Sequence, residues 1–170
     1  MRRLLSLLAA SLLLAANAEA KTPLADWAGV YKHQFKNGDV EGHSYQSEDI
    51  LELVPVDDTH AYVRIALEFF NGHSCSFAEV MTLEDARLIW RGKKEYDFDP
   101  CTLGVSADQS KIHIEDISRT CLSYYCGARG MLDGASWPLS AKRPIRYMDR
   151  LKGSREFKDA IASAKSAPKP

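Results

Sequence analysis

The strictest pattern in this chain is an alternation of apolar and other residues in the stretch 61–70. Every second position is apolar, and the members of this series are Ala61, Val63, Ile65, Leu67 and Phe69. Successive side chains of a β-strand point to opposite faces, whereas a helix repeats every 3.6 residues. The stretch therefore predicts a strand with one buried face. Asn71-Gly72 follows it and predicts a hairpin turn.

Shorter segments with strand character lie at regular intervals on both sides of this strand. They are Trp27–Phe35, Ile50–Val56, Ser74–Thr82, Ala86–Arg91, Cys101–Val105, Lys111–Ile117 and Met131–Leu139. Asn37-Gly38 after the first of them predicts another hairpin turn. Short strands separated by turns are typical of an antiparallel up-and-down meander. An open meander leaves two unpaired edges, so we predict an all-β fold that closes as a small barrel of about eight strands.

A barrel of this size is either filled by its side chains or holds one small ligand. Geometry does not choose between the two. The inward series is rich in Leu, Ile, Val and Phe, and such residues are usually found in packed interiors. We therefore favour a filled core.

Residues 1–20 have the three parts of a secretory signal peptide. Arg2 and Arg3 precede a leucine-rich run, and Ala18-Glu19-Ala20 forms a cleavage site of the A-x-A type. The apolar run is shorter than the ~20 residues that a bilayer span needs. We predict cleavage after Ala20 and a periplasmic or secreted product without a transmembrane span.

The four cysteines, an even set in a chain with an export signal, predict two disulfides. They are Cys75, Cys101, Cys121 and Cys126. Four cysteines allow three pairings, and the sequence does not choose among them. We favour Cys75 with Cys101 and Cys121 with Cys126. A zinc site would need thiolates at closer paired spacings, so we predict no metal and no cofactor.

The stretch from Cys121 to Trp137 combines two cysteines with three glycines and several aromatic residues. If both thiols form disulfides, no nucleophile remains there, and the glycines serve as turn positions before the last strand. Tyr124, Tyr125 and Arg129 are the candidate binding residues of this turn, because Tyr and Arg are enriched in binding hot spots.

The end of the chain differs in charge from everything before it. Residues 142–170 carry nine basic and three acidic residues, a net of +6, whereas residues 21–141 carry eleven basic and nineteen acidic ones, a net of −8. Apolar residues at spacings of three and four predict a basic C-terminal helix in two pieces, with Ser154 as the N-cap of the second. We therefore divide the chain into a signal peptide (1–20), a disulfide-braced barrel (21–141) and a basic tail (142–170).

The basic tail has two interpretations. In the first, its helix neutralises the acidic barrel and its apolar stripe covers a barrel end. In the second, it makes peripheral contact with anionic lipid or polymer of the cell envelope. We favour the first, since the apolar stripe is short and three acidic residues dilute the positive charge.

No pattern in the chain predicts catalysis. The five histidines stand apart, and the closest constellation, His113 with Glu115, is typical of a solvated strand face. A nucleophile elbow, a phosphate loop and a dinucleotide fingerprint are all missing. An exported, overall acidic chain without a recognition motif is also not expected to bind nucleic acid. We predict a protein that is not an enzyme.

Three features together resemble the small exported bacterial β-barrels of the lipocalin-like kind, and lysozyme inhibitors are the nearest named group. The features are Trp27-x-Gly29-x-Tyr31, the strand meander and the turn Tyr124-Tyr125-Cys126-Gly127. The resemblance implies a non-catalytic inhibitor that binds a protein, most concretely a basic hydrolase, and an acidic barrel suits such a partner. The chain departs from this group in its basic tail and in having no Ser-Gly-x-x-Tyr loop.

Two other functions fit the same sequence. The barrel interior could carry a small apolar ligand, or the basic tail (142–170) could tether a structural protein to the envelope.

Overall fold

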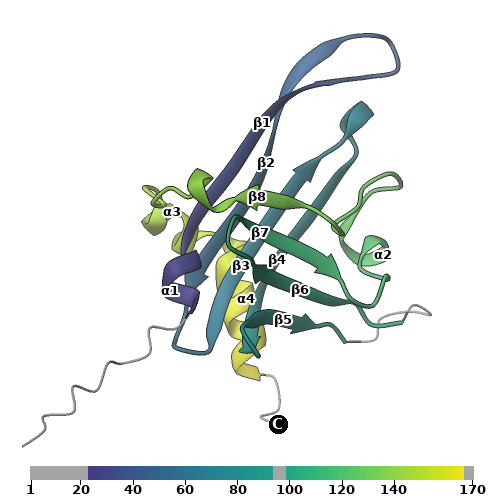
Figure 1. Cartoon of the computed structure of the whole chain (residues 1–170). Helices are drawn as coiled ribbons and strands as arrows, with labels where there is room; N and C mark the ends of the chain where they lie inside the picture. Colours follow the sequence, from purple (N-terminus) through teal and green to yellow (C-terminus); the bar gives the residue numbers. More distant parts are fainter. Residues whose placement is uncertain (1–22, 94–98, 167–170) are drawn as a thin grey trace, which may run out of the picture.

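The computed structural model of the chain describes residues 23–93 and 99–166, so the predicted signal peptide lies outside the described residues. Eight strands form one antiparallel sheet in which each strand pairs with its neighbours in the chain (Figure 1). They are β1 (Gly29–Gly38), β2 (Ser44–Pro55), β3 (His60–Glu68), β4 (Ser74–Glu84), β5 (Arg87–Arg91), β6 (Thr102–Ala107), β7 (Lys111–Asp116) and β8 (Ser136–Pro138). The predicted all-β meander is confirmed.

The sheet curls into a nearly closed barrel, and the closure involves a segment just after β8. Val30 of β1 and Arg143 exchange both backbone hydrogen bonds, each 2.9 Å long. Gly29 makes this approach possible, because a Cβ atom there would lie 2.8 Å from the carbonyl oxygen of Arg143. Beyond this bridge, β1 and β2 extend past the other strands as a two-stranded arm, residues 34–48 (Figure 1).

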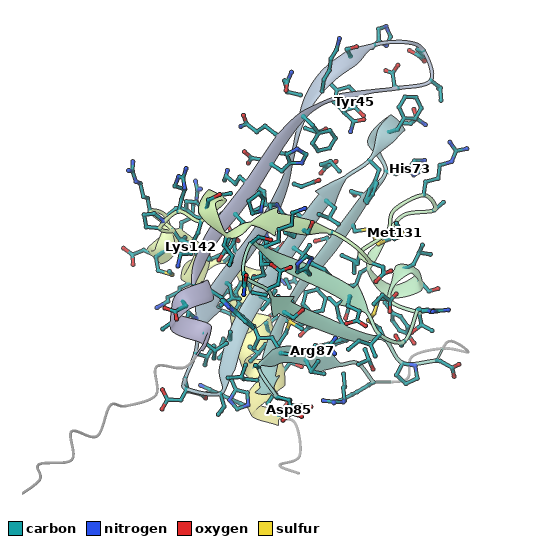
Figure 2. The ribbon with its side chains drawn as sticks, in the orientation of Figure 1. Tyr45, His73, Asp85, Arg87, Met131 and Lys142 are labelled. Atoms are coloured by element: carbon teal, nitrogen blue, oxygen red, sulfur yellow. A yellow bond between two sulfur atoms is a disulfide. The ribbon has the colours of Figure 1, made fainter. Side chains whose placement is uncertain are left out.

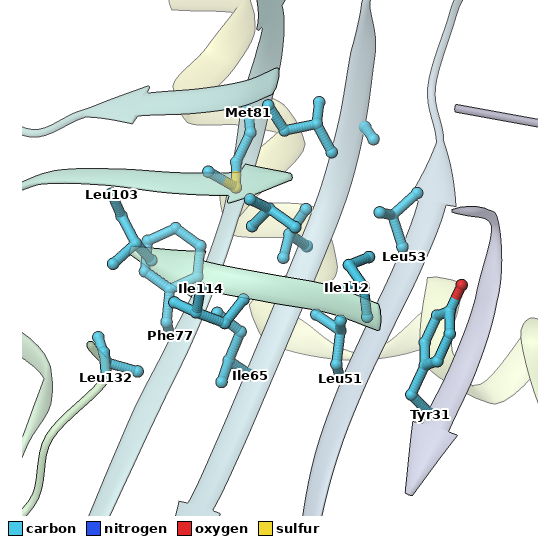
Figure 3. Close-up of a cluster of buried hydrophobic side chains, with 14 of the residues drawn as sticks. Tyr31, Leu51, Leu53, Ile65, Phe77, Met81, Leu103, Ile112, Ile114 and Leu132 are labelled. Carbon is cyan, nitrogen blue, oxygen red and sulfur yellow. The ribbon is translucent and has the colours of Figure 1, made fainter. Parts of the chain in front are cut away.

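The interior of the barrel is filled by apolar side chains, as the alternation predicts. Figure 3 shows part of this core, in which Leu51, Ile65 and Phe77 lie beside Leu103 and Ile112. Each of these five side chains is at least 99 % buried. Folding is therefore driven by burial of apolar surface inside the barrel.

The cysteines form two disulfides, but the pairing that we favoured is wrong. Cys75 is bonded to Cys126, and Cys101 is bonded to Cys121. The short helix α2 (Leu122–Tyr125) separates Cys121 from Cys126. It directs Cys121 to Cys101 at the start of β6 and Cys126 to the start of β4, where Cys75 forms an isolated bridge with it.

Three local predictions also need correction. The first hairpin does not turn at Asn37-Gly38, because Gly38 still pairs with Ser44 and the turn occupies 39–43. Asn37 instead donates from its side-chain amide to Ser47 and to the carbonyl of Phe69. The last strand is confined to β8 rather than Met131–Leu139. Trp27 belongs to the short helix α1 (Pro23–Trp27) and not to the first strand.

The tail forms two helices, α3 (Met148–Gly153) and α4 (Arg155–Ser166), with Ser154 as the predicted N-cap between them. The Ser154 hydroxyl accepts the N–H of Phe157 at 3.2 Å. Phe157 packs on Tyr62, with ring centroids 4.7 Å apart. The helices therefore cover the outer wall formed by β2, β3 and β4, and not a barrel end as we expected. In the described ranges, no helix has the length and apolar character needed to cross a bilayer.

Candidate functional site

A hollow of about 240 Å³ opens at the barrel end from which the arm projects. We call it the mouth hollow, and it is lined by His33, Asp49, Leu67, Phe69, Met131, Asp133, Gly134, Ala135, Ser136 and Trp137. In Figure 2, Tyr45, His73 and Met131 mark this end of the molecule, whereas Asp85 and Arg87 lie toward the opposite end. Strands β1, β2, β3 and β8 and the segment 131–135 all contribute to the lining.

Asp49 brings a carboxylate to the inner face of β2. It lies two residues before Leu51 and four before Leu53, which both point into the core, so the period of two turns its side chain inward. One oxygen accepts the backbone N–H of Glu68 at 2.9 Å. The other lies 3.9 Å from the Nδ1 atom of His33, too far for a hydrogen bond. Burial raises the pKa of the Asp49 carboxyl above its usual value.

Asp133 brings a second carboxylate from the loop that follows Cys126. Its Oδ1 atom accepts the N–H of Asp116 at 3.0 Å. Its other oxygen has no hydrogen bond within the described part of the chain. Both carboxylates are thus oriented by a backbone N–H and keep one oxygen available to a ligand.

The loop that carries Asp133 is fixed by the disulfide between Cys75 and Cys126. The N–H of Gly127 donates to the carbonyl of Ser74 at 2.9 Å. A Cβ atom at Gly130 would lie 2.6 Å from the sulfur of Cys75, so only glycine fits there. Leu132 is buried in the core. The side of the mouth hollow that the segment 131–135 forms therefore has a defined position.

Apolar side chains form the floor and the rim of the mouth hollow. Trp137 and Leu67 are buried beneath it, and the Trp137 indole N–H donates to the carbonyl of Asp49 at 3.4 Å. Met131 is 57 % exposed at its edge, and Phe70 on the β3–β4 turn is 51 % exposed. Large exposed apolar groups around one opening are typical of interaction sites.

Hydrogen bonds join the arm to the β3–β4 turn, so the exposed apolar side chains of both segments lie at the barrel end that carries the mouth hollow. The Tyr45 hydroxyl accepts the N–H of Gly72 at 3.1 Å, and the Asn71 side chain accepts the N–H of Val40 at 3.4 Å. Asn71 has φ of 62°, a left-handed conformation that Asn tolerates. Tyr45 and Val40 remain exposed beside Phe70.

The mouth hollow therefore combines two oriented carboxylates with an apolar floor. Among its lining residues, only His33 can carry a positive charge. A cationic group on an apolar stem, such as a lysine or arginine side chain, would pair with the carboxylates and cover the floor.

Asp49→Asn is expected to stabilise the free protein by about 0.5–1 kcal/mol near neutral pH. The raised pKa means that ionised Asp49 opposes folding above the pKa of the folded state, and this penalty disappears as the pH falls through that pKa. The gain should therefore be seen at pH 7 and be lost in acid. Urea unfolding at both pH values measures it, and an equal gain at both would contradict the assignment.

The candidate binding residues of the sequence do not line the mouth hollow. Tyr125, the last residue of α2, packs edge-on against Phe77 and Trp90, with centroid distances of 5.1 and 5.6 Å, so it anchors α2 to the barrel. Tyr124 lies next to it and is half-buried. Arg129 is exposed on the loop that leads to Met131. A binding role for these three residues stays a prediction.

His113 and Glu115 do not form a site with each other. His113 interacts with Asp108 at 2.8 Å, and Glu115 pairs with Arg87. Their separate partners agree with the expected solvated strand face.

One cluster of potential metal ligands occurs within the described ranges, at the tip of the arm. Oxygen and nitrogen atoms of Asp39, Glu41 and His43 lie within 4.8 Å of one another. Asp39 accepts the N–H groups of both other residues at 3.0 and 2.9 Å, which is the chemistry of a capped turn. The cluster therefore has a structural explanation.

Sequence reasoning did not identify Asp49, Asp133 or Trp137 as members of one site. Asp49 could have been found from the strand alternation, because it is two residues before Leu51 and four before Leu53 and therefore lies on the same inward face. Asp133 and Trp137 had no such signal, since the loop geometry decides where they lie.

Comparisons of this chain with models of known protein families, with curated proteins and with solved structures found no match.

Proposed function

We propose that this chain is an exported, non-catalytic binding protein of the bacterial cell envelope that engages a basic protein through its mouth hollow. The observation that carries the proposal is the pair of oriented carboxylates, Asp49 and Asp133, above an apolar floor. Lysozyme-type hydrolases are the most concrete partner, and inhibition of such an enzyme would be the biological result. The predicted signal peptide and the two disulfides support a periplasmic or secreted location.

The other two functions have weaker support. A carrier of a small apolar ligand needs interior space, but the core is filled, and the mouth hollow of about 240 Å³ is below the usual 300–1,000 Å³ of small-molecule pockets. A tether through the tail would have to use the faces of α3 and α4 that do not pack on the barrel.

The test is a binding and lysis experiment with the mature protein, residues 21–170. Basic lysozymes of several classes are offered at micromolar concentration, and both affinity and lytic activity are measured. We expect binding that weakens as salt is added, because opposite charges across the interface are screened. Asp49→Asn combined with Asp133→Asn should weaken it at least tenfold, which corresponds to about 1.4 kcal/mol.

Asp58→Asn combined with Asp85→Asn is the matched control for this experiment. Asp58 and Asp85 are exposed carboxylates on the β2–β3 and β4–β5 turns at the opposite barrel end, so their loss removes the same two negative charges without touching the mouth hollow. Equal effects of the two double variants would contradict a local site. Absence of binding to every basic protein would refute the proposal.

A further inference from the structure

Beyond Val30, the outer edge of β1 has no hydrogen-bonded strand beside it within the described residues, and this edge borders the mouth hollow. Alternate residues of an antiparallel strand direct their N–H and C=O groups to the same side. Val30 uses this side to bond Arg143, so Lys32, Gln34 and Lys36 direct their backbone groups there as well. The chain that precedes Arg143 coils into η2 (Leu139–Ala141), which lies near β1 but, within the described residues, makes no further backbone bond to it.

Neither a bulge nor a proline protects this edge, although β1 carries two lysines, Lys32 and Lys36. The register between β1 and β2 is continuous from Gly29 to Gly38, without a bulge, and the strand contains no proline. No described residue bonds the outward backbone groups of Gln34 or Lys36. The side chains of Lys32 and Gln34 bond Glu48 on the outer face of the sheet, so they do not cover the edge.

The inner face of the same strand leads directly into the mouth hollow. His33 and Phe35 lie on this face, with their rings stacked at 5.5 Å. A residue opposite His33 on an added strand would share its face, with Cβ atoms about 4.5–5.5 Å apart. Its side chain would enter the mouth hollow, where Asp49 and Asp133 each keep one available oxygen.

We propose that the partner donates an extended segment that adds to the edge of β1 as an antiparallel strand, with a lysine or arginine opposite His33. Backbone bonds to Gln34 and Lys36 supply affinity, and the two carboxylates select the cationic side chain. In the added segment, an apolar residue two positions from the lysine or arginine lies opposite Phe35, next to the exposed rim of the mouth hollow. This inference rests on the proposed function and specifies the form of the segment that the mouth hollow receives.

The probe is a synthetic peptide, acetyl-Thr-Val-Thr-Lys-Thr-amide, added to the ¹⁵N-labelled mature protein. With its lysine opposite His33, its valine faces Phe35 and its last threonine lies opposite Lys32, so Val30 keeps its bonds to Arg143. We expect slower hydrogen exchange at the amides of Gln34 and Lys36 on binding. A peptide with glutamate in place of the lysine should bind at least tenfold more weakly.

Backbone methylation tests strand pairing without changing the protein. Methylating the nitrogens of the two threonines that flank the lysine should abolish binding, because these N–H groups face β1. Methylating the valine and lysine nitrogens instead is the matched control and should weaken binding much less, since those groups face away. Equal losses for the two modified peptides would overturn the proposal.

Gln34→Pro removes one edge N–H and blocks the edge, whereas Gln34→Ala keeps the N–H and loses the same side-chain bond to Glu48. We expect at least a tenfold loss for the proline variant relative to the alanine variant. If the binding of a basic protein depends on Asp49 and Asp133 but is equal for Gln34→Pro and Gln34→Ala, strand addition is wrong and the proposed function still stands. If the protein forms a concentration-dependent dimer that Gln34→Pro abolishes and Gln34→Ala does not, the edge pairs with a second copy of the chain. This result would also overturn the proposal that a partner donates the strand.

Discussion

Replacing Cys75 and Cys126 together by alanine is expected to lower the free energy of unfolding by about 4 kcal/mol, because this disulfide closes a loop of 51 residues. The bond also fixes the segment 126–135, which carries Asp133 to the mouth hollow. Affinity for a basic partner should therefore fall as well. Urea unfolding and binding to a basic lysozyme measure the two effects.

The second disulfide provides the matched control. Cys101 and Cys121 are separated by only 20 residues, so the same double replacement should cost about 3 kcal/mol. This bond lies at the start of β6, and neither of its residues lines the mouth hollow. Its loss should reduce stability with little effect on affinity. Equal losses of affinity for the two double variants would show that stability alone decides binding.

Trp137→Ala is expected to cost about 3–5 kcal/mol of stability. Trp137 is 1 % exposed, is among the largest buried side chains of the described core and lies in the three-residue strand β8. The cavity left by the indole would sit directly under the mouth hollow and loosen its floor. Thermal or urea unfolding of the variant measures the loss.

Trp137→Phe separates packing from hydrogen bonding in this prediction. The phenyl ring fills most of the space but cannot donate to the carbonyl of Asp49, a long bond of 3.4 Å. We expect this variant to recover more than half of the stability that alanine loses. A phenylalanine variant as unstable as the alanine one would mean that the indole N–H is essential.

Local patterns predicted most of the strands but did not predict the site. The period of two placed the inward residues of β3 correctly, because side-chain alternation is a property of the strand itself. The mouth hollow joins His33, Asp49, Asp133 and Trp137, which are far apart in the chain. Only strand order, register and the path of the loop after Cys126 bring them together, and none of these is encoded locally.

The sequence by itself determined the antiparallel meander, the two disulfides and the cap at Ser154, since each depends on residue type and short spacing, whereas it only favoured the filled core. The tertiary structure decided the disulfide pairing, the docking of α3 and α4 on the outer wall and the unpaired edge of β1. Those features depend on which distant segments meet when the sheet curls. The barrel closes through Val30 and Arg143 rather than along the whole of β1. This partial closure leaves the edge and the mouth hollow side by side.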